Sequence, residues 1–147
     1  MSVFNSINIS GTGLTAERLR MDVISKNIAN ANTTRTANGT PYRRQVVTFQ
    51  EKSSQTPFSH YLRKSMDRDQ QRSGVEVTGI HNDPSPYKQV YDPGHPDANE
   101  EGYVLMPNVD TVTEMANMIS ASRAYEANIT AMNTTVSMAM RALEIGR

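Results

Sequence analysis

Apolar residues recur at helical spacing over two long stretches, one at each end of this 147-residue chain. In the first stretch they return every seven positions, with a second heptad position filled between them. The pattern covers about 25 residues, roughly seven helical turns. Its members are Ile7, Leu14, Met21, Ile24, Ile28 and Ala31, and Leu19 and Val23 widen the apolar face. Gly11 and Gly13 lie inside the pattern, and each costs a helix about 1 kcal/mol relative to Ala.

The second stretch carries two adjacent rows of residues at helical spacing. Asp110 or Thr111 can cap its beginning, and Thr111 with Glu114 has the spacing of a capping box. The first row runs through Val112, Met115, Ile119, Ser122, Glu126, Ile129, Asn133, Val136, Met140 and Leu143. The second runs through Met118, Ala121, Tyr125, Asn128, Met132, Thr135, Ala139 and Ala142. Two rows predict a long helix that contacts more than one neighbour.

Polar residues interrupt these rows where apolar residues are expected. Ser122, Glu126 and Asn133 stand in the first row, and Asn128 stands in the second. A polar residue at a core position lowers the stability of a coiled coil but fixes its register and its partners. We therefore predict that Glu126, Asn128 and Asn133 set register. The alternative is that the two terminal helices form the core of an ordinary helical hairpin.

The region between the two helical stretches has a different character. Four short runs of β-type residues, at 42–50, 74–81, 87–92 and 102–107, are bounded by Pro, Gly, Asn and Asp. Residues 57–73 are polar and highly charged, and they are predicted to form a loop. The fold class that follows is α+β, with long terminal helices and a small β-rich part between them.

Charges are unevenly distributed in this middle region. Residues 35–72 hold eight basic and three acidic residues, for a net charge of +5. Residues 76–101 hold six acids and Lys88, for a net charge of −5. Either these charges are solvated, or oppositely charged faces meet within one subunit or between subunits. We predict that Arg43 and Arg44 make contacts of this kind.

Composition removes several classes of function. The net charge of zero gives no basis for nucleic-acid binding or for broad adhesion to an anionic membrane. The absence of Cys excludes thiol catalysis, disulfides and Cys-ligated zinc. The first ten residues have neither the basic nor the continuous apolar region of a cleaved signal peptide. Taken alone, these features predict a cytosolic protein.

No catalytic motif is recognisable in the sequence. His60, His81 and His95 are scattered in loop-type sequence without metal-protease spacing. The stretches HNDPSP and DPGHPDANEE bring His close to Asp and Glu, so a divalent-metal site is an alternative there. Acids with Gly and Pro are also the usual composition of turns. We therefore predict no enzyme activity, no catalytic or metal site, no cofactor and no small-molecule substrate.

The stretch SKNIANANTTRT, residues 25–36, resembles the signature of bacterial flagellar rod and hook proteins. In that family the N-terminal helix ends in Asn, Ile or Leu, Ala and Asn, followed by Thr; the matching residues are Asn27, Ile28, Ala29, Asn30 and Thr33. The continuation TRTANGTPYRRQVV, with residues 85–109 and 114–133, resembles the proximal-rod members of the C type. Val136 departs from the pattern, because relatives often carry Lys there.

The resemblance implies a structural subunit of the proximal rod that polymerises helically into a drive shaft around an export channel. Its terminal helices are expected to pair as a coiled coil, from residues 1–36 and 108–147, with a β-rich outer domain at 37–107. Its expected partners are copies of itself, other rod proteins and the flagellar type III export apparatus. The cytosolic prediction is then replaced by the periplasmic part of the basal body, reached without a cleaved signal peptide.

This expectation also assigns roles to particular residues. The apolar residues of both helical patterns would form the axial interface, and Asn27, Asn30 and Asn32 would cap backbone groups where the first helix ends. Two other classes of function stay open. One is a periplasmic enzyme acting on peptidoglycan, with His95 and Asp97 as its test residues. The other is a coiled-coil adaptor or chaperone of export, which would remain cytosolic.

Overall fold

The computed structural model describes residues 3–52 and 74–145. Its elements are helix α1 (Val3–Ala29), strands β1 (Gln45–Glu51), β2 (Val75–Asn82), β3 (Lys88–Tyr91) and β4 (Tyr103–Met106), and helix α3 (Thr111–Ile145). The predicted α+β class is confirmed, and the ends of the four β-type runs lie within three residues of the ends of the four strands. The predicted loop at 57–73 lies outside the described residues.

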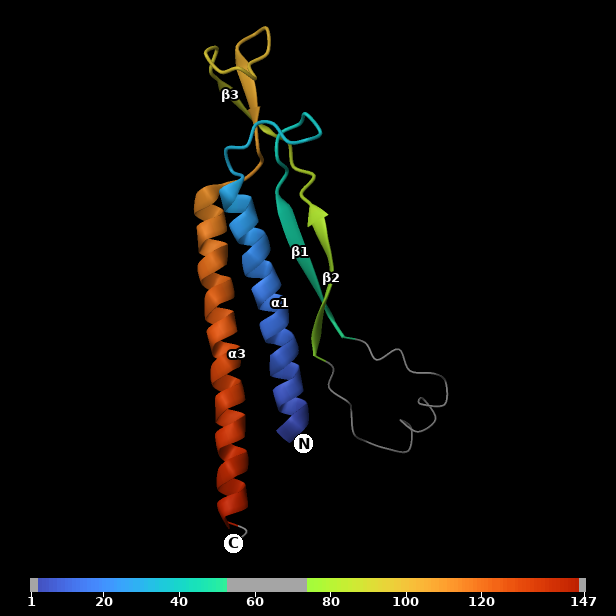
Figure 1. Ribbon diagram of the computed structural model, residues 1–147, viewed down its shortest axis with the longest axis vertical. Coiled ribbons are helices and arrows are strands. Elements are labelled where there is room, and N and C mark those ends of the chain that lie inside the picture. Colours follow the sequence, from blue (N-terminus) through green and yellow to red (C-terminus); the bar gives the residue numbers. More distant parts are fainter. Residues whose placement is uncertain (1–2, 53–73, 146–147) are drawn as a thin grey trace, which may run out of the picture.

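The helices and strands form three layers in an elongated molecule (Figure 1). Helices α1 and α3 lie antiparallel side by side, and the β1–β2 hairpin lies along α1 (Figure 1). The β3–β4 hairpin stands beyond the ends of the helices, at the end of the molecule opposite the C-terminus (Figure 1). Because α1 is the middle layer, it has to bury side chains on two faces.

The burial of α1 reflects this position between two neighbours. Its most buried residues are Ala16, Val23, Ile24 and Asn27, each no more than 5% exposed. The predicted heptad residues Ile7, Leu14, Met21 and Ile28 are half-buried rather than central. The pattern located the helix correctly and included Val23 and Ile24, but its seven-residue row lies to one side of the centre of the buried face.

Small residues permit the close packing around α1. A Cβ atom added to Gly13 would lie 3.2 Å from the Asn128 side-chain oxygen, so the two helices approach closely there. On the strand side, a Cβ on Gly74 would lie 2.1 Å from the Thr12 hydroxyl oxygen, which also accepts a hydrogen bond from the Val75 N–H at 3.1 Å. Gly13, which costs helix propensity, therefore serves packing.

Helix α3 is longer than α1, with 35 residues against 27. Asn27 meets Glu114 and Gly13 meets Asn128, and in each pair the two residue numbers sum to 141. In this antiparallel register Val3 lies level with Met138. The last two turns of α3 therefore extend beyond the start of α1 (Figure 1).

The ends of the helices have specific caps. The Asp110 carboxylate accepts a hydrogen bond from the Thr113 hydroxyl, and this bond is the main reason that the pKa of Asp110 is lowered. Of the two predicted caps, Asp110 is thus the one that the contacts support. The Asn30 side chain donates to the Lys26 carbonyl at 2.9 Å, but this carbonyl already accepts the Asn30 N–H at 3.1 Å, so the predicted cap satisfies no additional backbone group. The capping-box role of Glu114 was wrong, because its carboxylate points into the interior.

The β-strands form two separate antiparallel hairpins. Strand β1 pairs with β2, and a β-bulge at Thr78 shifts the register between Thr48 and Phe49. Strand β3 pairs with β4 in regular register. Gly102 precedes β4 with φ +81°, and a Cβ there would lie 2.9 Å from the Tyr91 ring, so glycine is required at this position.

No helix in the described part of the chain is long and apolar enough to cross a membrane.

Candidate functional site

A buried polar cluster joins the two helices to strand β1. We call it the junction network, and its members are Asn27, Tyr42, Arg44, Asp83 and Glu114. Its two most buried members are Asn27 and Glu114, each 1% exposed. A buried polar group without a hydrogen-bond partner lowers the stability of the fold. The hydrogen bonds of Asn27 and Glu114 therefore determine whether the junction network stabilises the fold.

Asn27 makes a full set of hydrogen bonds. Its side-chain nitrogen donates to the Gln45 carbonyl at 2.8 Å and to Glu114 Oε2 at 2.9 Å. Its side-chain oxygen accepts from the Gln45 N–H and from the Tyr42 hydroxyl, each at 2.9 Å. Two donors and two acceptors are the full capacity of an amide. Asn27 thus pairs with the backbone at the start of β1 instead of capping α1 as predicted.

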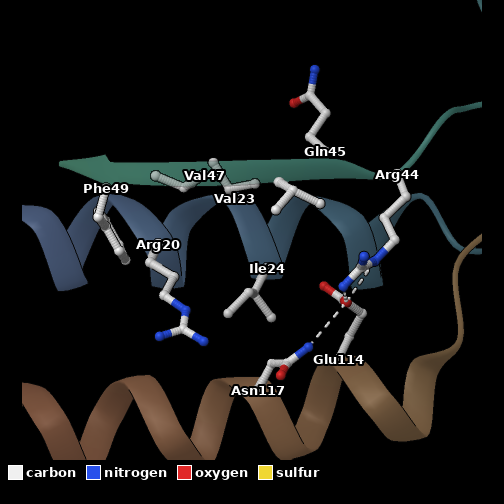
Figure 2. Close-up of a pocket in the computed structure, with 10 residues that line it drawn as sticks. Arg20, Val23, Ile24, Arg44, Gln45, Val47, Phe49, Glu114 and Asn117 are labelled. Carbon is white, nitrogen blue, oxygen red and sulfur yellow. Dashed lines mark hydrogen bonds and ion pairs between the residues drawn. The ribbon is translucent and has the colours of Figure 1, made fainter. Parts of the chain in front are cut away.

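Glu114 is the member that brings in helix α3. Its Oε1 accepts hydrogen bonds from Arg44 Nε at 3.0 Å and Arg44 Nη2 at 2.7 Å (Figure 2). Its Oε2 accepts from Asn27. A buried carboxylate is tolerated when it has both a countercharge and hydrogen bonds, and Glu114 has both.

Arg44 connects the network to the strand region. Its Nη1 donates to Asp83 Oδ2 at 3.1 Å, and its backbone N–H donates to the Asn108 side chain at 2.8 Å. Burial alone would lower the pKa of Arg44, but the hydrogen bonds to Glu114 and Asp83 outweigh it and raise that pKa. Burial, with Glu114 nearby, also raises the pKa of the Tyr42 hydroxyl. Both shifts keep the Arg44 guanidinium charged and the Tyr42 phenol neutral at neutral pH.

Asp83 gives the network a measurable pH dependence. Hydrogen bonds from Ser85 and then from Arg44 lower the pKa of Asp83 to about 2. Because this value lies below that of an unfolded Asp, about 3.9, the ionised carboxylate stabilises the fold above about pH 4. That contribution is lost as the pH falls through about 2.

Replacing Asp83→Asn should therefore lower the melting temperature near neutral pH. The difference from the parent should shrink as the pH falls from about 4 toward about 2. Thermal melts of both proteins across this range measure the effect, with the exposed Asp22→Asn as the control. A difference that stays constant with pH would contradict the role of the Asp83 charge.

Two ion pairs, one of them already described in the junction network, join segments of opposite charge, as one of the alternatives predicted. Arg44 pairs with Asp83, and Arg35 lies 3.8 Å from Asp97. Both pairs join the basic and acidic segments within one chain. Arg43 instead stacks on Tyr87, with its guanidinium carbon 4.7 Å from the ring centroid.

The residues of the metal and enzyme alternatives hold loops together. Asp97 Oδ2 accepts a hydrogen bond from the Thr34 hydroxyl at 2.8 Å, and His95 Nδ1 accepts from the Asp97 N–H at 3.1 Å. These contacts tie the segment after α1 to the loop between β3 and β4. Over residues 3–52 and 74–145, no three His, Asp or Glu side chains are grouped as metal ligands.

The first row of α3 is exposed, whereas the second faces α1. We call the apolar members of the first row the outer row: Val112, Met115, Ile119, Ile129, Val136, Met140 and Leu143, which are 38–76% exposed. In the second row Ala121 is fully buried and most others are half-buried. Large apolar side chains exposed along one side of a helix are typical of a protein–protein contact.

The predicted register residues divide between the two faces of α3. Glu126 and Asn133 are exposed beside the outer row, so within one chain they are not core residues. Asn128 is half-buried against α1, and its side chain donates to the Ala124 carbonyl at 2.9 Å. Their role between subunits stays a prediction.

Sequence reasoning missed Tyr42, Asp83 and Glu114 as members of the site. A signal for Glu114 was present: a step of four residues back from Met118, or of seven from Ala121, falls on it. Extending the second row by this step would have placed a carboxylate on the buried face. Asp83 and Tyr42 lie in loops, where no periodicity indicates burial.

Comparison with known proteins agrees with this architecture. Residues 7–35 match the family model described as flagella basal body rod protein, and residues 100–145 match the one described as flagellar basal body rod FlgEFG protein C-terminal. These ranges cover most of α1 and all of α3, together with the entry to α3.

Full-length relatives are similar over the whole chain. The flagellar basal-body rod protein FlgC of Bacillus subtilis is 49% identical, with 100% of both chains covered. FlgC of Borreliella burgdorferi is also 49% identical, over 99% of this chain and 98% of the relative. FlgC of Escherichia coli O6:H1 is 38% identical over 100% of both. The chain therefore belongs to the family of flagellar basal-body rod proteins, as a proximal rod protein.

Proposed function

We propose that this rod subunit is built into the rod through the outer row of α3, while α1 is used mainly within the subunit. The observation that carries the proposal is the contrast in burial along α3. Ala121 of the inner face is fully buried, whereas Ile119 of the outer row is 57% exposed. An exposed apolar row along a 35-residue helix requires covering, and neighbouring axial subunits would cover it.

The subunits would polymerise helically with other rod proteins around an export channel and transmit torque from the motor. In this arrangement the junction network holds the β-rich outer part in a fixed position against the helices. A rigid joint is needed wherever torque passes from one part of a subunit to another. The fully bonded Asn27 and the Arg44–Glu114 ion pair make this joint rigid.

The subunit would leave the cytoplasm through the flagellar type III export apparatus, without a cleaved signal peptide. A chain with no Cys forms no disulfide on this route, which suits passage through a narrow channel. We propose no enzyme activity, no small-molecule substrate and no nucleic-acid partner. The engagement of His95 and Asp97 in loop contacts supports that part of the proposal.

Replacing Ile119→Asp should abolish or strongly reduce motility while the purified subunit stays folded. The substitution puts a charge into the proposed contact, where burial without a partner is costly. Ser120→Asp is the matched control, because Ser120 is the exposed polar neighbour on the same helix. Motility of a complemented deletion strain, with thermal melts of the purified proteins, measures the effect. Normal motility of Ile119→Asp would contradict the proposed interface.

A further inference from the structure

A groove runs between β1 and α3, with α1 as its floor (Figure 2). Val23 and Ile24 of α1 form the floor, Val47 and Phe49 of β1 form one wall, and Asn117 of α3 lies on the other. The volume is about 310 Å³. Pockets for small molecules run from roughly 300 to 1,000 Å³, so this groove lies at the lower end of that range and has room for a few side chains.

The charged residues that line the groove are Glu114 and two arginines, which differ in how fully they are paired. Arg44 is neutralised by Glu114 and Asp83. Arg20 also lines the groove, and its side chain is 34% exposed (Figure 2). Within residues 3–52 and 74–145, its ionic contact is limited to Glu17 at 3.7 Å. An apolar floor beside a loosely paired cation favours an apolar segment that carries a carboxylate.

The C-terminal end of α3 shows this combination. It extends beyond α1, and Met140, Leu143 and Ile145 are 60%, 76% and 87% exposed. Glu144 lies between the last two. This end belongs to the segment, residues 100–145, that matches the C-terminal rod-protein model.

We propose that the groove binds the C-terminal end of the last helix of an adjacent axial subunit. Apolar side chains of that helix end pack on Val23, Ile24 and Phe49, and its carboxylate faces Arg20. The inference rests on the proposed rod assembly and assigns one of its contacts. Groove and helix end lie at different heights of the molecule, so the contact is heterologous and generates an open helical assembly.

The structure also gives the expected displacement between the two subunits. Leu143 lies 26 residues after Asn117 on α3, which is about 39 Å at 1.5 Å per residue. A neighbour with the same helical hairpin would therefore be shifted by about this distance along the helix axis.

Site-specific photocrosslinking in assembled flagella tests the contact. A benzophenone amino acid at position 49 of the full chain should give a covalent product, and mass spectrometry should map the partner peptide to the last helix of an axial subunit. The same amino acid at position 50, on the exposed side of β1, should not give it. Position 117 is the second groove site, to be used when the first variant fails to assemble. Motile cells without the product, or a product that maps to another segment, would overturn the inference and leave the rod function intact.

Charge reversal tests the role of Arg20 separately. Arg20→Glu should cause loss of the crosslinked product, and Arg18→Glu, at an exposed position on the same helix, should leave it. Changing the acidic residue of the crosslinked partner peptide to Lys should restore the product in the Arg20→Glu strain. An unchanged yield in Arg20→Glu, or no rescue, would overturn the assigned charge contact. Thermal melts of purified Arg20→Glu should match the parent.

Discussion

Replacing Glu114→Ala should destabilise the folded chain by about 3 kcal/mol or more, the cost of breaking a buried ion pair by removing one partner. The change leaves Arg44 with Asp83 alone and removes the acceptor of one Asn27 hydrogen bond. Part of the effect comes from the Arg44 charge, which is only about a quarter exposed and so cannot be fully solvated. The remaining contact of Arg44 with Asp83 and the exposed quarter of its side chain reduce this cost, so we place the value at the lower end of the range.

Denaturant unfolding of the purified protein measures this loss. Glu126→Ala is the matched control, because Glu126 lies on the exposed side of the same helix. Surface substitutions of that kind usually change stability by within about 0.5 kcal/mol. Equal effects of the two substitutions would show that the junction network contributes no more than a surface charge.

Replacing Glu126→Leu and Asn133→Leu together should make the purified protein associate indiscriminately and should leave few functional flagella. Both residues lie beside the outer row, seven positions apart. Leucine there would complete the apolar surface and remove a desolvation cost, at the expense of register. Association would increase while correct assembly decreases, which is the reverse of simple destabilisation.

Size-exclusion chromatography of the double variant, beside a motility assay, gives the measurement. The control is Ala127→Leu with Thr134→Leu, which adds two leucines at the same spacing on an exposed neighbouring row. A monomeric, motile double variant would show that Glu126 and Asn133 face solvent in the rod. Their assignment to register would then be wrong.

The sequence predicted the helices because their periodicity is long. Two rows at consistent spacing in α3 allowed few other interpretations, and the strands followed from β-type runs between turn residues. What periodicity could not show is which row faces inward. That depends on the position of α1 between α3 and the β1–β2 hairpin, and therefore on contacts distant in the sequence.

The junction network was only partly predictable for the same reason. Asn27 and Arg44 were identified, but as a cap and as an outer-domain contact. Their actual partner, Glu114, lies 87 residues from one and 70 from the other. No local pattern records a hydrogen bond over such a separation. The domain boundaries at 36/37 and 107/108 stay predictions.

A density map of the intact basal body would test the central claim, that the outer row of α3 contacts neighbouring axial subunits. We predict that side chains of adjacent subunits pack on Ile119 and Ile129 and remove them from solvent. We also predict that the Arg44–Glu114 pair is retained in each subunit. A map in which the outer row faces solvent along its length, with the subunits joined only through their β-strands, would contradict the account.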